Sequence, residues 1–297
     1  MWVIVCIGVV VFAKCIFDMW DLPRWAVWGL VIAIYMAVHV LVIDENPFLR
    51  MVALCSVLMA GMKAVVYSEW RRGGGGWLRW RPYLYFVAAW FGMDPRPWEK
   101  LGRVRSEWKK DMIVGLGCLI CGVSLLFLFE FMEIAHVIAV FIALSMAFHF
   151  GVLRVLTGYW RSRGVGVRAL FRNPLEARGF GDFWGKRWNL AYSQMMAIAV
   201  QRPLEERFGR AWAVFTVFVI SGLFHELAIT VPVGAGYGLP TLFFTLQGGF
   251  VALERTFGVG GKWLCLGSLV LGIPVLFPPA FVDAVILPVS KFLTQWI

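Results

Sequence analysis

The chain has 297 residues, of which 60% are hydrophobic and only 15% are charged, and its formal net charge is +10. Soluble domains are about half apolar and about a quarter charged, because much of any folded surface faces water. This composition excludes a water-soluble globular protein and predicts an integral membrane protein with several spans. The basic residues lie in loops between apolar runs, which indicates membrane topology rather than nucleic-acid binding.

Eight apolar runs are candidate spans, since about 20 helical residues cross the hydrocarbon core. In chain order they are Trp2–Phe17, Trp25–Ile43, Phe48–Val66, Met112–Phe131, Ile134–Leu156, Ala211–Val231, Thr241–Phe257 and Trp263–Leu287. The first run has no basic leading segment and no clear cleavage site, so we expect a retained span rather than a signal peptide. The last run contains Pro274, Pro278 and Pro279, which predict a kink or a break.

Two shorter apolar pieces, Tyr83–Phe91 and Leu190–Val200, are too short to cross alone, and we expect re-entrant or interfacial helices there. The overall expectation is an all-α polytopic bundle. It forms one membrane domain over residues 1–297, with N-terminal spans and basic loops in 1–172, a core segment in 173–258 and C-terminal spans in 259–297.

Two long loops, 67–111 and 154–189, are rich in Lys and Arg, whereas the turns 44–46 and 130–133 are acidic. The positive-inside rule places both basic loops in the cytoplasm and the N-terminus outside. If Leu190–Val200 crossed the membrane, Arg255 and Lys262 would lie outside. A segment that dips in and returns keeps them inside, and we favour that interpretation.

The six cysteines, Cys6, Cys15, Cys55, Cys118, Cys121 and Cys265, all lie in apolar stretches. Cys118 and Cys121 form a CxxC pair, but no second ligand pair accompanies them, so packing is favoured over zinc or redox chemistry and no metal site is expected. The run Gly73–Gly76 lacks the Lys-Ser/Thr of a phosphate-binding loop and predicts a flexible turn.

Four histidines are present, His39, His136, His149 and His225, and each could be a satisfied packing residue. His225 differs through its neighbours. Ser221 lies four residues earlier on the same helix face, Gly222 allows a helix or ligand to approach closely, and Glu226 adds a second ionisable group at membrane depth. This segment is a candidate site. Glu226 either orients the imidazole or faces another helix, and the second is favoured because adjacent helical positions point apart.

A second cluster, Asn173–Leu190, mixes aromatic residues, charges and glycines without a clear amphipathic period. This composition indicates a cytoplasmic amphipathic or re-entrant element that lines a cavity. The alternative is an interfacial helix with Trp and Arg anchors.

The elements DFWGKRWN at 182–189 and SGLFHEL at 221–227 resemble, in this order, the wax synthase branch of the membrane-bound O-acyltransferase (MBOAT) superfamily. The resemblance covers about residues 173–258. It implies a multi-helix fold around an intramembrane tunnel, with His225 as catalytic base and Asn189 as its essential partner. Lys186 stands where the family commonly has Arg, which keeps the charge but loses the planar fork.

The resemblance further implies transfer of a fatty acyl group from acyl-CoA to an alcohol, most simply a long-chain alcohol that becomes a wax ester. Acyl-CoA is a co-substrate and no other cofactor is expected. We expect the partners to be acyl-CoA, the lipid alcohol and membrane lipids, and the sequence leaves the oligomeric state open. Beyond the two catalytic candidates, the expected substrate-binding residues are Asp182, Trp184, Lys186, Arg187, Trp188, Ser221 and Glu226.

Three questions stay open at this point. Asn189 either donates to the developing oxyanion or orients the acyl chain. The basic loop 154–187 either binds the phosphates of CoA or only sets topology. The acceptor is a long-chain alcohol, or the enzyme transfers an acyl or acetyl group to a sterol, a terpenoid or another small alcohol. A lipid or small-molecule transporter is the rival class, since a broken span and buried ionisable residues also suit alternating access.

Overall fold

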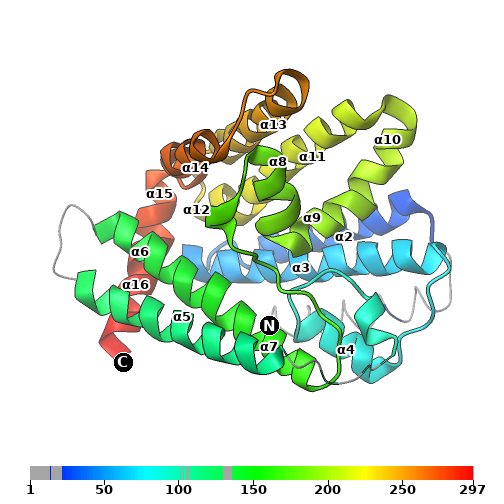
Figure 1. Cartoon of the computed structure of the whole chain (residues 1–297), viewed down its shortest axis with the longest axis horizontal. Helices are drawn as coiled ribbons and strands as arrows, with labels where there is room; N and C mark the ends of the chain where they lie inside the picture. The colour runs from blue at the N-terminus through cyan, green and yellow to red at the C-terminus, as the bar shows by residue number, and fades with distance from the viewer. Residues whose placement is uncertain are drawn as a thin grey trace.

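The computed structural model describes Lys14 and residues 22–296, except 101, 103, 105–106 and 130–135. The described residues form helices and connecting loops without a strand, which confirms the all-α prediction (Figure 1). The predicted span Trp2–Phe17 and the acidic turn 130–133 lie outside the described residues, apart from Lys14.

The helices of the first half are α2 (Arg24–Leu41), α3 (Pro47–Arg72), α4 (Trp80–Ala88), α5 (Trp108–Phe129), α6 (His136–Ser145) and α7 (Leu153–Ser162). A π-helical stretch over Met146–Val152 joins α6 and α7 into one continuous helix. Short 3₁₀ turns form at Arg96–Trp98 and Pro174–Glu176.

The helices of the second half are α8 (Phe180–Asp182), α9 (Leu190–Met196), α10 (Arg202–Phe208), α11 (Arg210–His225), α12 (Val231–Val233), α13 (Leu239–Phe257), α14 (Lys262–Leu276), α15 (Pro279–Phe281) and α16 (Leu287–Trp296). Four π-helical stretches continue or join them, at Phe183–Arg187, Ala197–Gln201, Glu226–Thr230 and Val282–Ile286. Residues 190–208 and 210–233 are therefore two long continuous helices.

Five described helices are long and apolar enough to cross a membrane, and they span Arg24–Leu41, Pro47–Arg72, Trp108–Leu128, Val137–Ser162 and Arg210–Val233. A sixth span forms if the pair Lys262–Leu276 and Pro279–Gln295, bent by 72°, counts as one. The predicted Thr241–Phe257 span is the helix α13, but Gln247, Glu254 and Arg255 interrupt its apolar character. The described part of the chain is thus a multi-pass helical protein, and the total of eight membrane spans stays a prediction.

The predicted break near the C-terminal prolines is confirmed. α14 ends at Leu276, Phe277 has an extended backbone (φ −116°, ψ 88°), and α15 begins at Pro279. The residue before a proline avoids the helical region, which explains why the helix stops there.

α4 is too short to cross, as predicted, and a buried lysine of α3 holds it in place. Lys63 is 0% exposed, and its Nζ donates to the backbone carbonyls of Phe86, Trp90 and Gly92 at 2.5, 2.6 and 2.9 Å. These carbonyls belong to the C-terminal end of α4 and the loop after it, where cations are favourable.

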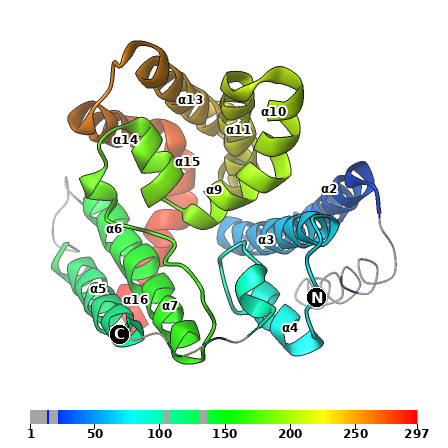
Figure 2. The same ribbon diagram turned by 45° about the vertical axis from the view of Figure 1, so that its right-hand side comes forward.

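Residues 190–233 form a helical hairpin around Gly209. Gly209 has φ 77°, a left-handed conformation that glycine adopts without strain, and it separates α10 from α11. A one-residue connection makes the two long helices antiparallel neighbours, and Figure 2 shows α9, α10 and α11 together with α13. Leu190–Val200 is the first part of a continuous 19-residue helix that runs to Phe208, and the chain reverses only at Gly209, so a dip and return within 190–200 stays a prediction. The hairpin brings the start of α9 back towards the end of α11.

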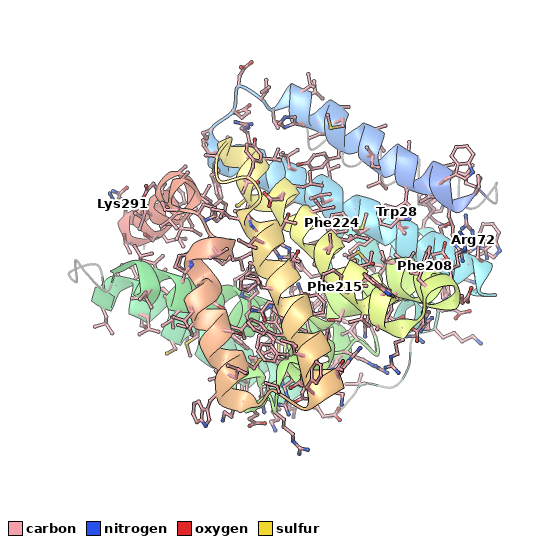
Figure 3. The ribbon with its side chains drawn as sticks, turned by 90° about the horizontal axis from the view of Figure 1, so that it is seen from above. Trp28, Arg72, Phe208, Phe215, Phe224 and Lys291 are labelled. Carbon is pink, nitrogen blue, oxygen red and sulfur yellow. The ribbon has the colours of Figure 1, made fainter. Side chains whose placement is uncertain are left out.

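α11 is held from two sides. A Cβ added at Gly222 would lie 2.5 Å from the Thr241 Cα, so α13 approaches α11 as closely as that glycine permits. On the other side, Trp28 of α2 stacks on Phe224 with ring centroids 6.5 Å apart (Figure 3), and the Tyr35 hydroxyl donates to the Leu227 carbonyl. This packing places the end of α11 between two helix layers.

Candidate active site

A cavity of about 240 Å³ lies between four segments, which are residues 181–189, the helix from α9 to Gln201, α11 and α13. Five of the residues singled out from the sequence line it, namely Trp184, Trp188, Asn189, Ser221 and His225. The hairpin and the close packing of α11 on α13 therefore bring both sequence motifs to one cavity.

His225 is positioned by its own helix. Its Nδ1 lies 2.6 Å from the Ser221 backbone carbonyl one turn earlier, and its ring lies against Phe244 of α13 with centroids 4.2 Å apart. A carbonyl oxygen only accepts, so Nδ1 carries the proton that is shared in this bond. In the neutral ring, Nε2 is then unprotonated, and it makes no hydrogen bond with the described residues. Such an imidazole is set up as a proton acceptor.

Ser221 does not share a side-chain hydrogen bond with His225. Its hydroxyl donates to the Val217 carbonyl at 2.7 Å, and only its backbone contacts the imidazole. This arrangement does not activate the hydroxyl as a nucleophile.

Asn189 begins α9 in a left-handed conformation, φ 40° and ψ 62°. Its Oδ1 accepts from the Tyr192 backbone N–H at 3.3 Å and so caps the helix. Because the oxygen takes this hydrogen bond, the amide nitrogen Nδ2 is the end that remains for a ligand, and it makes no hydrogen bond with the described residues. Asn and Asp adopt left-handed backbone more readily than other non-glycine residues, which fits asparagine at this position.

The walls of the cavity are aromatic. Trp184 donates from Nε1 to Gln247 at 3.2 Å, and its ring contacts Phe218 and Phe244 with centroids 6.0 and 5.5 Å apart. Trp188 stacks on Phe183 at 5.5 Å. Fixed rings of this kind exclude water and leave polar groups at few points of the wall.

Asp182, Lys186 and Arg187 are not among the residues that line the cavity. Lys186 is exposed, whereas Asp182 accepts from Arg187 Nε at 2.7 Å, and Arg187 Nη1 donates to the Asn173 carbonyl. Burial raises the pKa of Asp182, but the hydrogen bonds from Arg187 and the Arg178 backbone outweigh it and hold the pKa below the usual range. The hydrogen bonds of Asp182 and Arg187 stabilise the segment 182–189 that carries the first motif. A role of Asp182, Lys186 and Arg187 in substrate binding stays a prediction.

Glu226 also lies outside the cavity lining and faces another helix, as its position in the sequence favours. Its carboxylate accepts from the Thr230 hydroxyl at 2.5 Å and from the Thr241 backbone N–H and hydroxyl at 3.0 and 2.8 Å. Thr241 lies in the first turn of α13, so the carboxylate caps that helix. Glu226 thus ties the end of α11 to the helix that carries Phe244.

Exchanging Glu226 for Gln is expected to lower the thermal stability of the purified protein in detergent. Hydrogen bonds to a charged acceptor contribute about 1.5–3 kcal/mol, and the amide offers only one acceptor oxygen for three donors. Glu176→Gln, at a carboxylate that is 66% exposed, is the matched control. Equal melting temperatures for the two variants would show that Glu226 does not fasten α13.

Other residues at the site had no clear sequence signal. Glu254 of α13 accepts from the backbone N–H groups of Phe180 and Gly181 at 3.1 and 2.7 Å, and so fastens the motif loop. Arg255 lines the cavity, although the sequence indicates only its side of the membrane. Tyr192 lines it too, and its position three residues after Asn189 was the available clue.

Comparison with known proteins agrees with the motifs. Residues 167–246 match the Membrane bound O-acyl transferase family. "Probable long-chain-alcohol O-fatty-acyltransferase 9" of Arabidopsis thaliana is 31% identical over 154 residues, covering 44% of this chain and 45% of the relative. "Long-chain-alcohol O-fatty-acyltransferase" of Simmondsia chinensis is 28% identical over 183 residues, covering 55% and 51%.

A third relative, "Acyl-CoA--sterol O-acyltransferase 1" of Arabidopsis thaliana, is 30% identical over 105 residues, covering 31% of this chain and 30% of the relative. The chain spans about half the length of the first two of these relatives, and less of the third. The resemblance to the wax synthase branch of the MBOAT superfamily is confirmed, and the matched segment 167–246 contains both motifs.

Proposed function

We propose that this chain, whose segment 167–246 resembles the wax synthase branch of the MBOAT superfamily, transfers a fatty acyl group from acyl-CoA to the hydroxyl of a long-chain alcohol. The products are an ester and free CoA. The observation that carries the proposal is the single cavity into which His225 and Asn189 both project, with Nε2 of one and Nδ2 of the other unengaged by the described residues.

His225 acts as the general base. Nε2 takes the hydroxyl proton as the alcohol oxygen forms its bond to the thioester carbonyl carbon, and the carbonyl π pair moves to oxygen. When the tetrahedral intermediate collapses, the C–S bond breaks and the imidazolium returns the proton to the CoA sulfur. The Nδ1 bond to the Ser221 carbonyl keeps the ring oriented through both transfers.

Asn189 stabilises the oxygen on which negative charge develops. Its Nδ2 is a preorganised donor because the capping bond to Tyr192 N–H holds the amide plane. One such donor contributes about 3–4 kcal/mol to a transition state of this kind.

In this proposal the phosphates of CoA bind at Arg210 and Arg255. Arg255 lines the cavity and, with Arg210, also lines a shallower groove at the Gly209 end of the hairpin. Charge-assisted bonds from arginine suit phosphate. α11 has 16 residues from Arg210 to His225, a length of about 22 Å, which the extended pantetheine arm can follow to the imidazole.

The arginines of the 154–187 loop are less suited to this role. Arg154 and Arg161 each lie 2.6 Å from the buried carboxylate of Asp111, and Arg187 pairs with Asp182. No arginine of that loop is among the described residues lining the cavity. The ion pairs of Arg154, Arg161 and Arg187 fasten helices and loops, whereas Arg255 lines both the cavity and the groove, so the groove is the better phosphate site even though Arg210 lies 4.0 Å from Glu205.

The cavity is proposed as the central part of a tunnel whose polar mouth opens at Arg210 and Arg255 on the cytoplasmic side. The positive-inside rule supports this orientation, since Arg255 and Lys262 then lie with the basic loops. The acyl chain and the lipid alcohol would reach His225 from the bilayer.

A sterol is the second candidate acceptor, because one relative is named for acyl transfer to sterols. Purified protein in lipid nanodiscs is incubated with labelled palmitoyl-CoA and hexadecanol, a sterol, a terpenoid alcohol or no acceptor. The expected result is labelled ester with hexadecanol. A preference for the sterol would reassign the acceptor, and the absence of ester from every pair would remove the acyltransferase proposal in favour of transport, tested by flux into vesicles.

A further inference from the structure

Tyr192 places a buried hydroxyl without a partner at the candidate active site. The residue lines the cavity, and its hydroxyl oxygen is buried without a hydrogen bond to any residue that the structure describes. The Ser221 hydroxyl lies beside it and donates to the Val217 carbonyl, but the distance and angles between the Tyr192 and Ser221 hydroxyls do not form a hydrogen bond. A buried polar group without a partner costs about 1–3 kcal/mol, which makes such a group in a binding cavity a candidate ligand contact.

The surroundings of Tyr192 connect it to both catalytic candidates. Its backbone N–H holds the Asn189 amide, and its ring lies edge-on to His225 with centroids 6.1 Å apart. The ring also meets Phe224 at 6.3 Å. The ring of Tyr192 is thus held against the base, while the backbone of the same helical residue holds the amide of Asn189.

The state of the phenol suits a donor. Burial raises the pKa of Tyr192 above its ordinary value, and the neighbouring Ser221 offsets this only in part. The hydroxyl keeps its proton at neutral pH, so it can donate to an oxygen but cannot replace His225 as the base.

We propose that the Tyr192 hydroxyl is a catalytic hydrogen-bond donor that binds the thioester carbonyl oxygen of the acyl donor together with Asn189 Nδ2. The inference rests on the proposed acyl transfer. As the alcohol oxygen bonds to the carbonyl carbon, the π pair moves onto the carbonyl oxygen, where both donors meet it. The pair returns when the C–S bond breaks and CoA leaves, and Tyr192 keeps its proton throughout. Two donors then form the oxyanion site. The motif 182–189 supplies Asn189, and Tyr192 lies outside it.

Tyr192→Phe removes only the hydroxyl and tests this role. We expect kcat to fall about 10²-fold with KM for palmitoyl-CoA within about twofold, because the donor acts on charge that develops in the transition state. Binding of S-hexadecyl-CoA, a thioether without the carbonyl oxygen, stays unchanged. The melting temperature stays equal or rises, since the lost hydroxyl has no partner among the residues that the structure describes. Tyr85→Phe, on α4 with 47% exposure, is the matched control and keeps full activity.

A kcat within about twofold of the parent protein would overturn the role of Tyr192. So would a lower melting temperature accompanied by weaker thioether binding, which is the pattern of a structural residue. These outcomes are read in a parent protein that makes ester. A parent protein that binds the thioether but makes no ester from any alcohol would instead overturn the proposed function.

Discussion

His225→Ala lowers ester synthesis by about 10²–10⁴-fold, the range that a general base contributes. The structural reason is the ring's geometry. Nδ1 is committed to the Ser221 carbonyl, so Nε2 is the available base in the cavity, and alanine removes it. Turnover is measured with saturating palmitoyl-CoA and hexadecanol in nanodiscs, and thermal unfolding confirms that the variant is folded.

His39→Ala is the control for this variant. His39 lies on α2 and is not among the cavity-lining residues, so its loss leaves turnover near that of the parent protein. Turnover of His225→Ala equal to the parent would show that ester formation does not use this imidazole. In that case the cavity would have to be assigned another role.

Asn189→Asp lowers kcat by about 10²–10³-fold while the protein stays folded. Aspartate tolerates the left-handed backbone and can still cap α9 through the Tyr192 N–H, so the local structure is kept. The change replaces a donor by a negatively charged acceptor, which repels the developing oxyanion. A fall in kcat without loss of thermal stability separates the donor from the cap.

Asn173→Asp is the matched control variant for Asn189→Asp. Asn173 is the other described non-glycine residue with positive φ, at 42°, and its exposed side chain donates to Glu176 rather than entering the cavity. It tests whether aspartate in a left-handed position is itself harmful. An equal loss of activity in both variants would attribute the effect to the backbone and remove the donor role of Asn189.

The sequence predicted the helices well where composition alone decides them. Long apolar runs form helices α2, α3, α5 and α11, and the C-terminal prolines interrupt the helix at Phe277. The prediction was less complete for Leu190–Val200, because its apolar stretch ends before its helix does. Charged residues of α10 continue the helix to Phe208, and the reversal occurs at Gly209 instead.

The candidate site, like the helices, could be predicted from the sequence only in part. The motifs point to His225 and Asn189, and both line the cavity. The sequence did not distinguish the motif residues that line the cavity, such as Trp184, from those that brace its loop, such as Arg187. This distinction depends on the direction of each side chain, which an irregular segment with a π-helical turn does not reveal by periodicity.

By itself, the sequence determined that this protein is a multi-pass helical membrane protein with an MBOAT-like pair of motifs, because apolar content and contiguous residues are properties of the chain. Only the tertiary structure decided that the motifs meet, since their meeting depends on the turn at Gly209 and on the close approach of α13 at Gly222. It also decided which polar atoms remain available. Nδ1 of His225, Oδ1 of Asn189 and both carboxylate oxygens of Glu226 are satisfied within the fold. Nε2 of His225 and Nδ2 of Asn189 make no hydrogen bond with the described residues, so they remain available to a substrate in the cavity.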